Sequence, residues 1–296
     1  MNLTSLYRKC ISRKIRRKIY SCFLADLLCL FRKPKTFILK KYYRFYYMVN
    51  KPIEDIDIAK YEWSKKAFTV YPYSWEKEYL QHNHEVHFDS ERNLNYVIHN
   101  GRKLYFKRNL PNGVDDLYNT LLIEQDIRSG HRYVENYDCL KGKNLLDIGC
   151  AEAIFTLDTI GYVNHAYLFE CDEGWIEALE ATFSPYKDKV TIIQKYVSEA
   201  ADENEITIDS FVATQGIDNI FLKMDIEGFE RKALKGAQNT FSSQQQIEGA
   251  VCIYHLPDDK KVIGDMLTQY KCKISTVKGF LYMDWGFTEG VMRFKK

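Results

Sequence analysis

From residue 143 onward, short apolar segments alternate with longer segments whose apolar residues have helical spacing. We predict strands at 144–148, 166–170, 190–194, 220–224 and 247–254, and helices at 152–160, 175–183, 227–237 and 260–270. Segments that are apolar throughout are typical of strands buried on both faces, as in a parallel sheet with helices on either side. This alternation therefore predicts an α/β domain with a mostly parallel central sheet over residues 120–296.

The region before this domain has a different pattern. An antiparallel pair is predicted there, 95–99 with 102–106, and a second, 280–284 with 290–294, is predicted to close the domain at its carboxyl end. The first pair flanks Asn100-Gly101, and both turn residues tolerate the positive φ angles of a tight hairpin. A helix is expected at 124–133. Residues 52–119 are accordingly predicted to form a small mixed cap, as an α+β N-terminal extension.

The N-terminal segment is strongly basic. Residues 1–51 hold 14 Lys and Arg against one acidic residue, Asp26, whereas the rest of the chain holds 28 against 39. Residues 3–23 have the apolar spacing of a helix with basic residues on most of the other side. We predict a basic amphipathic arm that binds an anionic membrane surface. A helix packed on the body or a disordered tail is the alternative, and nucleic acid is disfavoured because no reader motif accompanies the charge.

The cysteines and the apolar runs indicate the cellular compartment. The eight cysteines form no CxxC pair and no zinc-like spacing, which is typical of reduced thiols in the cytosol. The apolar run at 20–31 contains Asp26 and is shorter than the roughly 20 residues that span a bilayer. The sequence therefore predicts a cytoplasmic protein that is peripheral at the inner face of the membrane.

The first chemical motif is the turn that follows the strand predicted at 144–148. Gly149 lets the backbone turn closely into a helix, and Glu170 follows the next strand, 23 residues after Asp147. A carboxylate at that position accepts the hydroxyls of a ribose, which indicates a nucleoside-containing cofactor. The same two turns bring Cys150, Glu152 and Cys171 to the expected cofactor site.

The identity of that cofactor follows from the glycine pattern. Ala151 stands where a dinucleotide-binding turn has its second glycine, which allows close approach to a pyrophosphate. S-adenosylmethionine has no phosphate, and the early Asp147 suits its ammonium group. A nicotinamide-dependent oxidoreductase is thus the disfavoured alternative. An ordinary strand–helix turn with a surface glutamate, without any cofactor, is the second alternative.

The second motif spans residues 220–230. Period-two alternation places Lys223 and Asp225 on the same side of a strand, at the rim where ligands bind. A lysine in such an apolar strand needs a partner, and we expect it to be Asp225. Glu227 and Glu230 also fit acids in the first turn of a helix, where the dipole contributes about 0.3–1 kcal/mol.

The third motif is the segment that ends the strand predicted at 247–254. His255 lies at its carboxyl end, and a neutral imidazole accepts a hydroxyl proton near pH 7. A lone histidine is also common in a purely structural role. We predict the catalytic set His255, Asp225, Glu227 and Lys223, with His255 as the first candidate for the base and Asp225 as the second.

Five segments together carry a family resemblance: LLDIGCAEAIFTL, LFECDEGWIEALEATF, TIDSF, FLKMDIEGFERKALKGA and CIYHLPDD. They resemble the FkbM-type methyltransferases, a branch of the class I, Rossmann-like enzymes, over residues 120–296. The resemblance implies an S-adenosylmethionine-dependent O-methyltransferase that acts on a small-molecule or glycan hydroxyl, as in polysaccharide modification. The reaction would be an in-line displacement. A fold that has lost turnover and binds a partner or a membrane is the alternative.

The same resemblance implies roles for individual residues. Asp147, Gly149 and Glu170 would bind the cofactor, and Asp225 and Glu227 would lie near the transferred methyl. Ala153 departs from the glycine that is common in the family, which would place the helix slightly farther from the cofactor. A divalent cation such as Mg²⁺, held by the two oxygen ligands Asp225 and Glu227, is the alternative way to lower the pKa of the hydroxyl.

Overall fold

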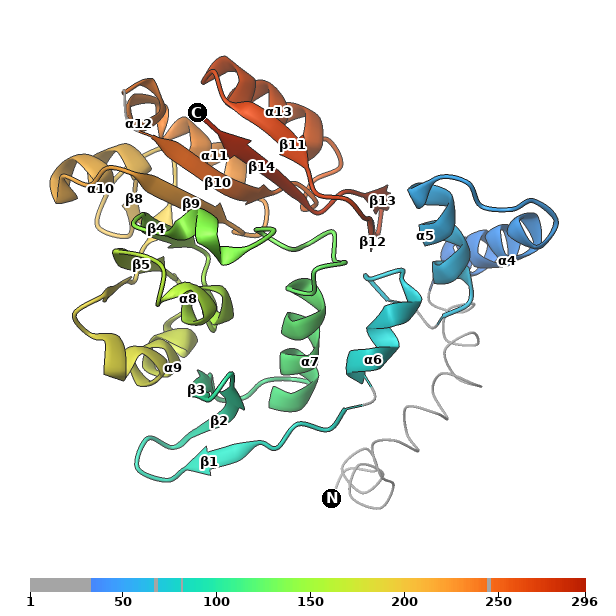
Figure 1. Ribbon diagram of the computed structural model, residues 1–296, viewed down its shortest axis with the longest axis horizontal. Helices are drawn as coiled ribbons and strands as arrows, with labels where there is room; N and C mark the ends of the chain where they lie inside the picture. Colours follow the sequence, from blue (N-terminus) through green and yellow to red (C-terminus); the bar gives the residue numbers. More distant parts are fainter. Residues whose placement is uncertain (1–32, 67–68, 81, 244–245) are drawn as a thin grey trace. The chain divides into compact units, whose positions relative to one another are not determined.

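A computed structural model describes residues 33–66, 69–80, 82–243 and 246–296, so the helix predicted at 3–23 lies outside the described residues. The chain divides into two compact units (Figure 1). The smaller unit is 1–82 with 279–288, and the larger one is 83–278 with 289–296. The boundaries predicted at 51/52 and 119/120 do not coincide with this division, and each unit is described by itself.

The larger unit is built around one mixed sheet. In the described part of the chain this sheet has seven strands, in the order β11-β14-β10-β9-β4-β5-β6. Their bounds are β4 (Asn144–Ile148), β5 (His165–Phe169), β6 (Val190–Ile193), β9 (Ile220–Met224), β10 (Ile247–Cys252), β11 (Lys273–Thr276) and β14 (Val291–Lys295). β14 runs antiparallel to both of its neighbours, β10 and β11, and the other neighbouring strands in this sheet are parallel. The predicted Rossmann-like α/β fold with a mostly parallel sheet is confirmed.

Helices cover both faces of the sheet. Their bounds are α7 (Val114–Glu124), η3 (Tyr137–Leu140), α8 (Ile154–Thr159), α9 (Glu173–Phe183), η4 (Ser184–Tyr186), α10 (Ile208–Gln215), α11 (Glu230–Lys235), α12 (Gln238–Ser242) and α13 (Asp259–Gln269), and a small parallel pair is formed by β7 (Tyr196–Val197) and β8 (Glu205–Ile206). Successive residues of β4 belong to different apolar clusters: Leu146 packs with Phe211 and Ile263, whereas Leu145 packs with Phe155. This alternation is the reason that the strand is apolar throughout.

A three-stranded antiparallel sheet precedes the domain, formed by β1 (His87–Asp89), β2 (Leu94–His99) and β3 (Arg102–Phe106). The hairpin predicted between β2 and β3 is confirmed, with positive φ angles at Asn100 (49°) and Gly101 (76°). Phe106 shares a buried cluster with Trp175 and other residues of α9. These strands therefore pack on the sheet's helical layer as part of the larger unit.

Two predicted elements are wrong. Residues 124–133 are not a helix, because α7 ends at Glu124 and the Asp126 carboxylate accepts the Arg128 backbone N–H at 2.7 Å, which favours a turn. Segments 280–284 and 290–294 do not pair with each other. Instead β12 (Leu281–Met283) pairs with β13 (Gly286–Thr288), and β14 inserts between β10 and β11 because its side chains belong to the core.

The smaller unit contains α4 (Pro34–Val49), α5 (Asp55–Ser64), η2 (Ser74–Glu76), α6 (Lys77–Leu80) and the β12–β13 pair. Its centre is Trp63, which is fully buried and whose ring centroid lies 3.9 Å from that of Tyr282. Lys66 pairs with Glu76 in the same unit. No helix in the described part of the chain combines the length and the apolarity needed to cross a bilayer.

Gly249 in β10 offers a test of sheet packing. A Cβ there would lie 2.2 Å from the Leu222 carbonyl oxygen and 2.6 Å from Cζ of Phe294. We expect Gly249→Ala to lower the free energy of unfolding by about 1–3 kcal/mol in urea denaturation, because neighbouring atoms must move. The control is Gly161→Ala, whose Cβ would meet nothing within 4 Å. Equal stability of the two variants would contradict this packing.

Candidate active site

The predicted site residues lie at the carboxyl ends of four adjacent strands. Gly149, Glu170, Asp225 and His255 follow β4, β5, β9 and β10, which are neighbours in the order β10-β9-β4-β5 (Figure 1). The chain leaves β4 toward β5 on one side of it and returns to β9 on the other. Ligands of open α/β sheets bind at such a topological switch point, above the strand ends.

Gly149 brings the first turn against the end of β9. It has φ of +74°, and a Cβ on it would lie 2.0 Å from the Asp225 carbonyl oxygen. The Asp225 N–H donates to the Ile148 carbonyl at 3.0 Å, so the two strand ends are joined directly. Only glycine fits this approach. Ala151 and Ala153 continue the turn with φ of 47° and 58°, a left-handed conformation that costs an alanine more than a glycine.

Glu170 ties the turns after β4 and β5 together. Its carboxylate accepts the Ala151 N–H at 2.9 Å and the Asp172 N–H at 2.8 Å, one on each oxygen. The side chain is buried. Because each carboxylate oxygen can accept two hydrogen bonds, each retains capacity for one more donor. The arrangement fits the prediction that Glu170 binds a ribose.

The other predicted cofactor residues differ in character. Glu152 is buried, and this desolvation raises the pKa of its carboxyl to about 7. Cys150 is also buried, and burial raises the pKa of its thiol well above the ordinary value, so it is no nucleophile. Cys171 is exposed, and partial burial raises the pKa of its thiol too. Glu152 is therefore the member of this group best suited to bind a cation.

Lys223 pairs with Asp147, which corrects the predicted pairing with Asp225. Its Nζ lies 2.9 Å from Oδ1 of Asp147 and donates to the Gly149 carbonyl at 2.6 Å. Thr156 donates to the other Asp147 oxygen at 2.6 Å. Burial acts to lower the pKa of Lys223, but the charges of Asp147 and Asp225 outweigh it and raise the pKa. The reason for the pairing is register, since Asp147 and Lys223 are directly opposite each other in β4 and β9.

Asp225 is consequently available to other partners. Tyr133 donates to its Oδ2 at 2.9 Å, and Tyr254 donates to its Oδ1 at 3.3 Å. His131 Nε2 lies 3.5 Å from Oδ2. Burial acts to raise the pKa of Asp225, but the nearby His131 and Lys223 outweigh it and lower the pKa. Asp225 is thus a carboxylate held in its charged form.

His255 stands between two carboxylates. Its Nδ1 lies 2.9 Å from Oε1 of Glu230, and its Nε2 lies 3.4 Å from Oδ1 of Asp225. The side chain is only 7% exposed, and neither Nδ1 nor Nε2 makes a hydrogen bond of good geometry within the described part of the protein. Burial acts to lower the pKa of His255, but the hydrogen bond and charge of Glu230 and the charge of Asp225 outweigh it and raise the pKa above 6.5.

Glu227 and Glu230 have opposite surroundings. The Glu227 side chain is 92% exposed and lies 3.7 Å from Nε2 of His255, on a residue with φ of 55°. Glu230 is fully buried and accepts the Ile226 N–H at 2.9 Å. The sequence pattern of Glu230 fits an acidic residue in the first turn of a helix. In the structure Glu230 is the partner that orients His255.

Sequence analysis missed three members of this cluster. His131 and Tyr133 lie in the segment wrongly predicted as a helix, and no motif marks them. Tyr254 directly precedes His255 but carries no signal in the sequence alone. Burial lowers the pKa of His131 to about 4, and burial raises the pKa of Tyr133 well above 10.

Metal-ligating side chains also meet here. Two sets in the described part of the chain have ligand atoms within 4.8 Å of one another: His131, Asp225 and Cys252, and Asp225, Glu230 and His255. The predicted Mg²⁺ pair of Asp225 and Glu227 is not one of these sets. Imidazole and thiolate suit transition metals rather than Mg²⁺. The donor chemistry around Asp225 therefore does not favour the predicted cation.

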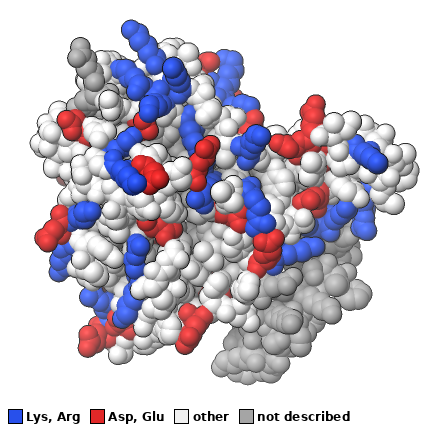
Figure 2. Space-filling view, in the orientation of Figure 1, with Lys and Arg blue, Asp and Glu red and all other residues white. Residues whose placement is uncertain are grey.

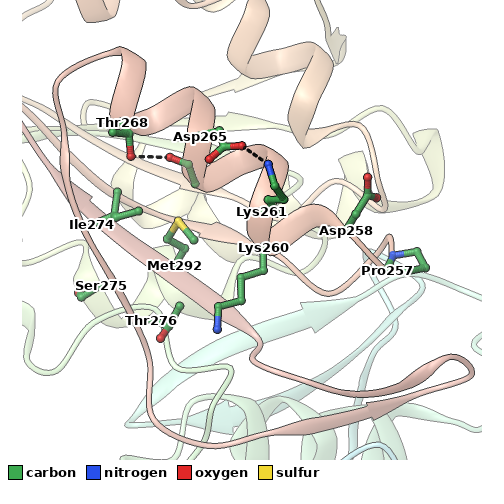
Figure 3. A pocket seen from close by; sticks show the side chains of 11 residues that line it. Pro257, Asp258, Lys260, Lys261, Asp265, Thr268, Ile274, Ser275, Thr276 and Met292 are labelled. Atoms are coloured by element: carbon green, nitrogen blue, oxygen red, sulfur yellow. Dashed lines mark hydrogen bonds and ion pairs between the residues drawn. The ribbon is translucent and has the colours of Figure 1, made fainter.

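A separate groove of about 540 Å³ lies between α13 and the strands β11 and β14 (Figure 3). Its lining includes Lys260, Lys261, Asp265 and Met292, and Lys261 pairs with Asp265 at 2.7 Å. None of the predicted site residues lines it. The groove is thus distinct from the candidate active site.

Comparison with protein families identifies the domain. Residues 179–270 match the model of the methyltransferase FkbM domain, a span that contains Lys223, Asp225 and His255. This match confirms the predicted similarity to the FkbM-type methyltransferases over residues 179–270, a shorter span than the predicted 120–296. No curated protein sequence matches the chain.

Solved structures similar to this chain include three with low identity. Precorrin 8w decarboxylase from Methanobacterium thermoautotrophicum is 17% identical, with 53% of this chain and 85% of that one covered and a TM-score of 0.35. Magnesium protoporphyrin IX methyltransferase from Synechocystis, with bound S-adenosylmethionine, is 11% identical. The match covers 53% of this chain and 71% of that one, with a TM-score of 0.35. A methyltransferase from Aquifex aeolicus is 9% identical, with 54% of this chain and 84% of that one covered and a TM-score of 0.36. The order and direction of the strands, rather than these likenesses, define the fold.

The Lys223–Asp147 pair makes a prediction for stability. Lys223→Met leaves a buried aspartate without its counter-ion, and we expect a loss of about 3–5 kcal/mol in the free energy of unfolding. Adding Asp147→Asn removes the uncompensated charge and should restore a large part of this loss. Denaturation of both variants at neutral pH measures the difference. Additive losses in the double variant would show that the two side chains do not interact.

Proposed function

We propose that the protein is an S-adenosylmethionine-dependent O-methyltransferase that acts on a hydroxyl of a sugar or glycan, with His255 as the general base. The observation that carries the proposal is the state of His255. Its Nδ1 lies 2.9 Å from Oε1 of Glu230 and its Nε2 lies 3.4 Å from Oδ1 of Asp225, so each ring nitrogen faces a carboxylate, and neither makes a hydrogen bond of good geometry within the described residues. This base stands next to the strand ends that hold the predicted cofactor residues. The choice of a sugar as acceptor rests on the family resemblance of the sequence motifs described above.

The residues present fit S-adenosylmethionine. Glu170 retains acceptor capacity for ribose hydroxyls, and Glu152 offers a buried carboxyl for the ammonium group. When bound, S-adenosylmethionine supplies a methyl group bonded to a positively charged sulfur, and this sulfur is a good leaving group. The task of the protein is then chiefly to hold the hydroxyl in line and to remove its proton.

His255 performs the proton removal in this proposal. Glu230 fixes the proton on Nδ1, which leaves the lone pair of Nε2 free to accept the proton of the substrate hydroxyl. The imidazolium that results is stabilised by Asp225, which Tyr133 and Tyr254 hold in place. A base of this kind typically contributes about 10²–10⁴-fold to the rate.

Cofactor binding provides the first test. Glu170→Gln replaces a carboxylate by an amide, which presents an N–H₂ group to the Ala151 or Asp172 N–H and loses acceptor capacity. We expect titration calorimetry to show S-adenosylmethionine affinity reduced by at least about tenfold, because hydrogen bonds to a charged acceptor contribute about 1.5–3 kcal/mol. The matched control is Glu173→Gln on an exposed residue of α9. Equal affinities for both variants would remove Glu170 from the cofactor site.

The pH dependence of turnover provides the second test. Below its raised pKa His255 is protonated and cannot accept a proton, so kcat should rise with pH through a value above 6.5. Glu230→Gln removes the chief interaction that raises this pKa, and the rising limb should move to lower pH.

His255→Ala should cut kcat about 10²–10⁴-fold with unchanged cofactor affinity.

Two controls test whether the pH dependence of turnover comes from His255 rather than from a different histidine or a bound cation. His165→Ala changes a histidine at the opposite end of the sheet, at the start of β5, and should leave the profile unchanged. A rising limb that stays in place in Glu230→Gln would contradict the role of His255. Loss of activity in a chelator, restored by Mg²⁺, would instead support the cation alternative at Asp225 and Glu227.

A further inference from the structure

Helix α4 in the smaller unit presents an apolar stripe to solvent. Ile38, Tyr42, Phe45 and Val49 are spaced by three or four residues and so lie along one side of the helix. Their exposed fractions are 66%, 55%, 73% and 73%. Apolar side chains that are exposed singly are common, but a continuous exposed stripe marks an interaction surface.

The opposite side of α4 fixes the direction of this stripe. Lys40 is buried and donates from Nζ to the Trp63 carbonyl at 3.2 Å. Tyr47 is also buried and donates to Asp57 of α5 at 2.6 Å. The helix is thus anchored within its own unit through polar contacts. The outward orientation of the apolar stripe follows from that anchoring.

Basic residues lie on both sides of the stripe. Lys35 lies on the side of the helix that carries Tyr42, two turns before it, whereas Lys41 lies on the other side of the stripe, and both are exposed. The sequence of α4 contains no acidic residue. By contrast, basic and acidic side chains are interspersed over much of the face of the molecule shown in Figure 2. The combination of an apolar stripe with cationic flanks is complementary to an anionic lipid surface.

We propose that α4 docks the protein on an anionic membrane surface, with the stripe Ile38, Tyr42, Phe45 and Val49 inserted among the lipids. The cations beside the stripe contact the headgroups. Tyr42 and Tyr46, whose ring centroids lie 5.7 Å apart, suit the boundary between the apolar and polar layers. This surface lies within the described residues and is separate from the helix predicted at 3–23.

Tryptophan fluorescence tests the insertion directly. Phe45→Trp in the full-length protein should show a blue shift with mixed phosphatidylcholine–phosphatidylserine vesicles, and brominated lipid should quench it. Ile98→Trp, on an exposed residue of β2 in the larger unit (51% exposed), is the matched control and should show neither effect. Equal responses of the two tryptophans, or no response of either, would overturn the proposal.

Sedimentation with vesicles distinguishes binding through the stripe from binding through the basic helix predicted at 3–23. Ile38→Asp with Phe45→Asp should weaken binding to the mixed vesicles by at least about tenfold, because burying one such side chain corresponds to about 1.5–3 kcal/mol. The control pair Ile98→Asp with Ile127→Asp should bind as the wild type does. Unchanged binding of the stripe variant would overturn the proposal and assign binding to the basic helix predicted at 3–23. A wild type that dimerises through the stripe and ignores vesicles would overturn it too.

Discussion

The buried ion pair of Lys223 and Asp147 joins the parts on which the site depends. The two residues are directly opposite each other in adjacent parallel strands. Lys223 also donates to the Gly149 carbonyl, and Asp147 accepts from Thr156 of α8. One pair of charges thus connects β9, β4, the turn after β4 and the helix that follows it. A buried pair is costly to desolvate, and here the hydrogen bonds with Thr156 and the Gly149 carbonyl offset part of that cost.

This pairing leaves the second charged residue at the end of β9 for chemistry. Asp225 lies two residues beyond Lys223, where Tyr133, Tyr254 and His255 surround it. The two aspartates therefore have different tasks: Asp147 neutralises a buried lysine, whereas Asp225 remains charged beside an imidazole. Glu230 completes the arrangement from the start of α11. The carboxylates on the two sides of His255 raise the pKa of its imidazole.

The bounds of the parallel strands at the site are predictable from sequence within one or two residues. Short segments that are apolar throughout are typical of strands buried on both faces. The strand-end positions of Asp225 and His255 follow from the same pattern. The partner of Lys223 is not predictable from this pattern. It depends on the register between β4 and β9, which places Asp147 directly opposite Lys223. His131 and Tyr133 come from an irregular segment, where no periodicity indicates what a side chain will contact.

The central claim is that the cofactor lies above β4 and β5 with its reactive end toward Asp225 and His255. A crystal structure with S-adenosylhomocysteine tests it most directly. The account predicts ribose hydroxyls within hydrogen-bond distance of the Glu170 carboxylate and the sulfur on the side of β9. Density for the ligand in another location, or a ribose that makes no contact with Glu170, would contradict it.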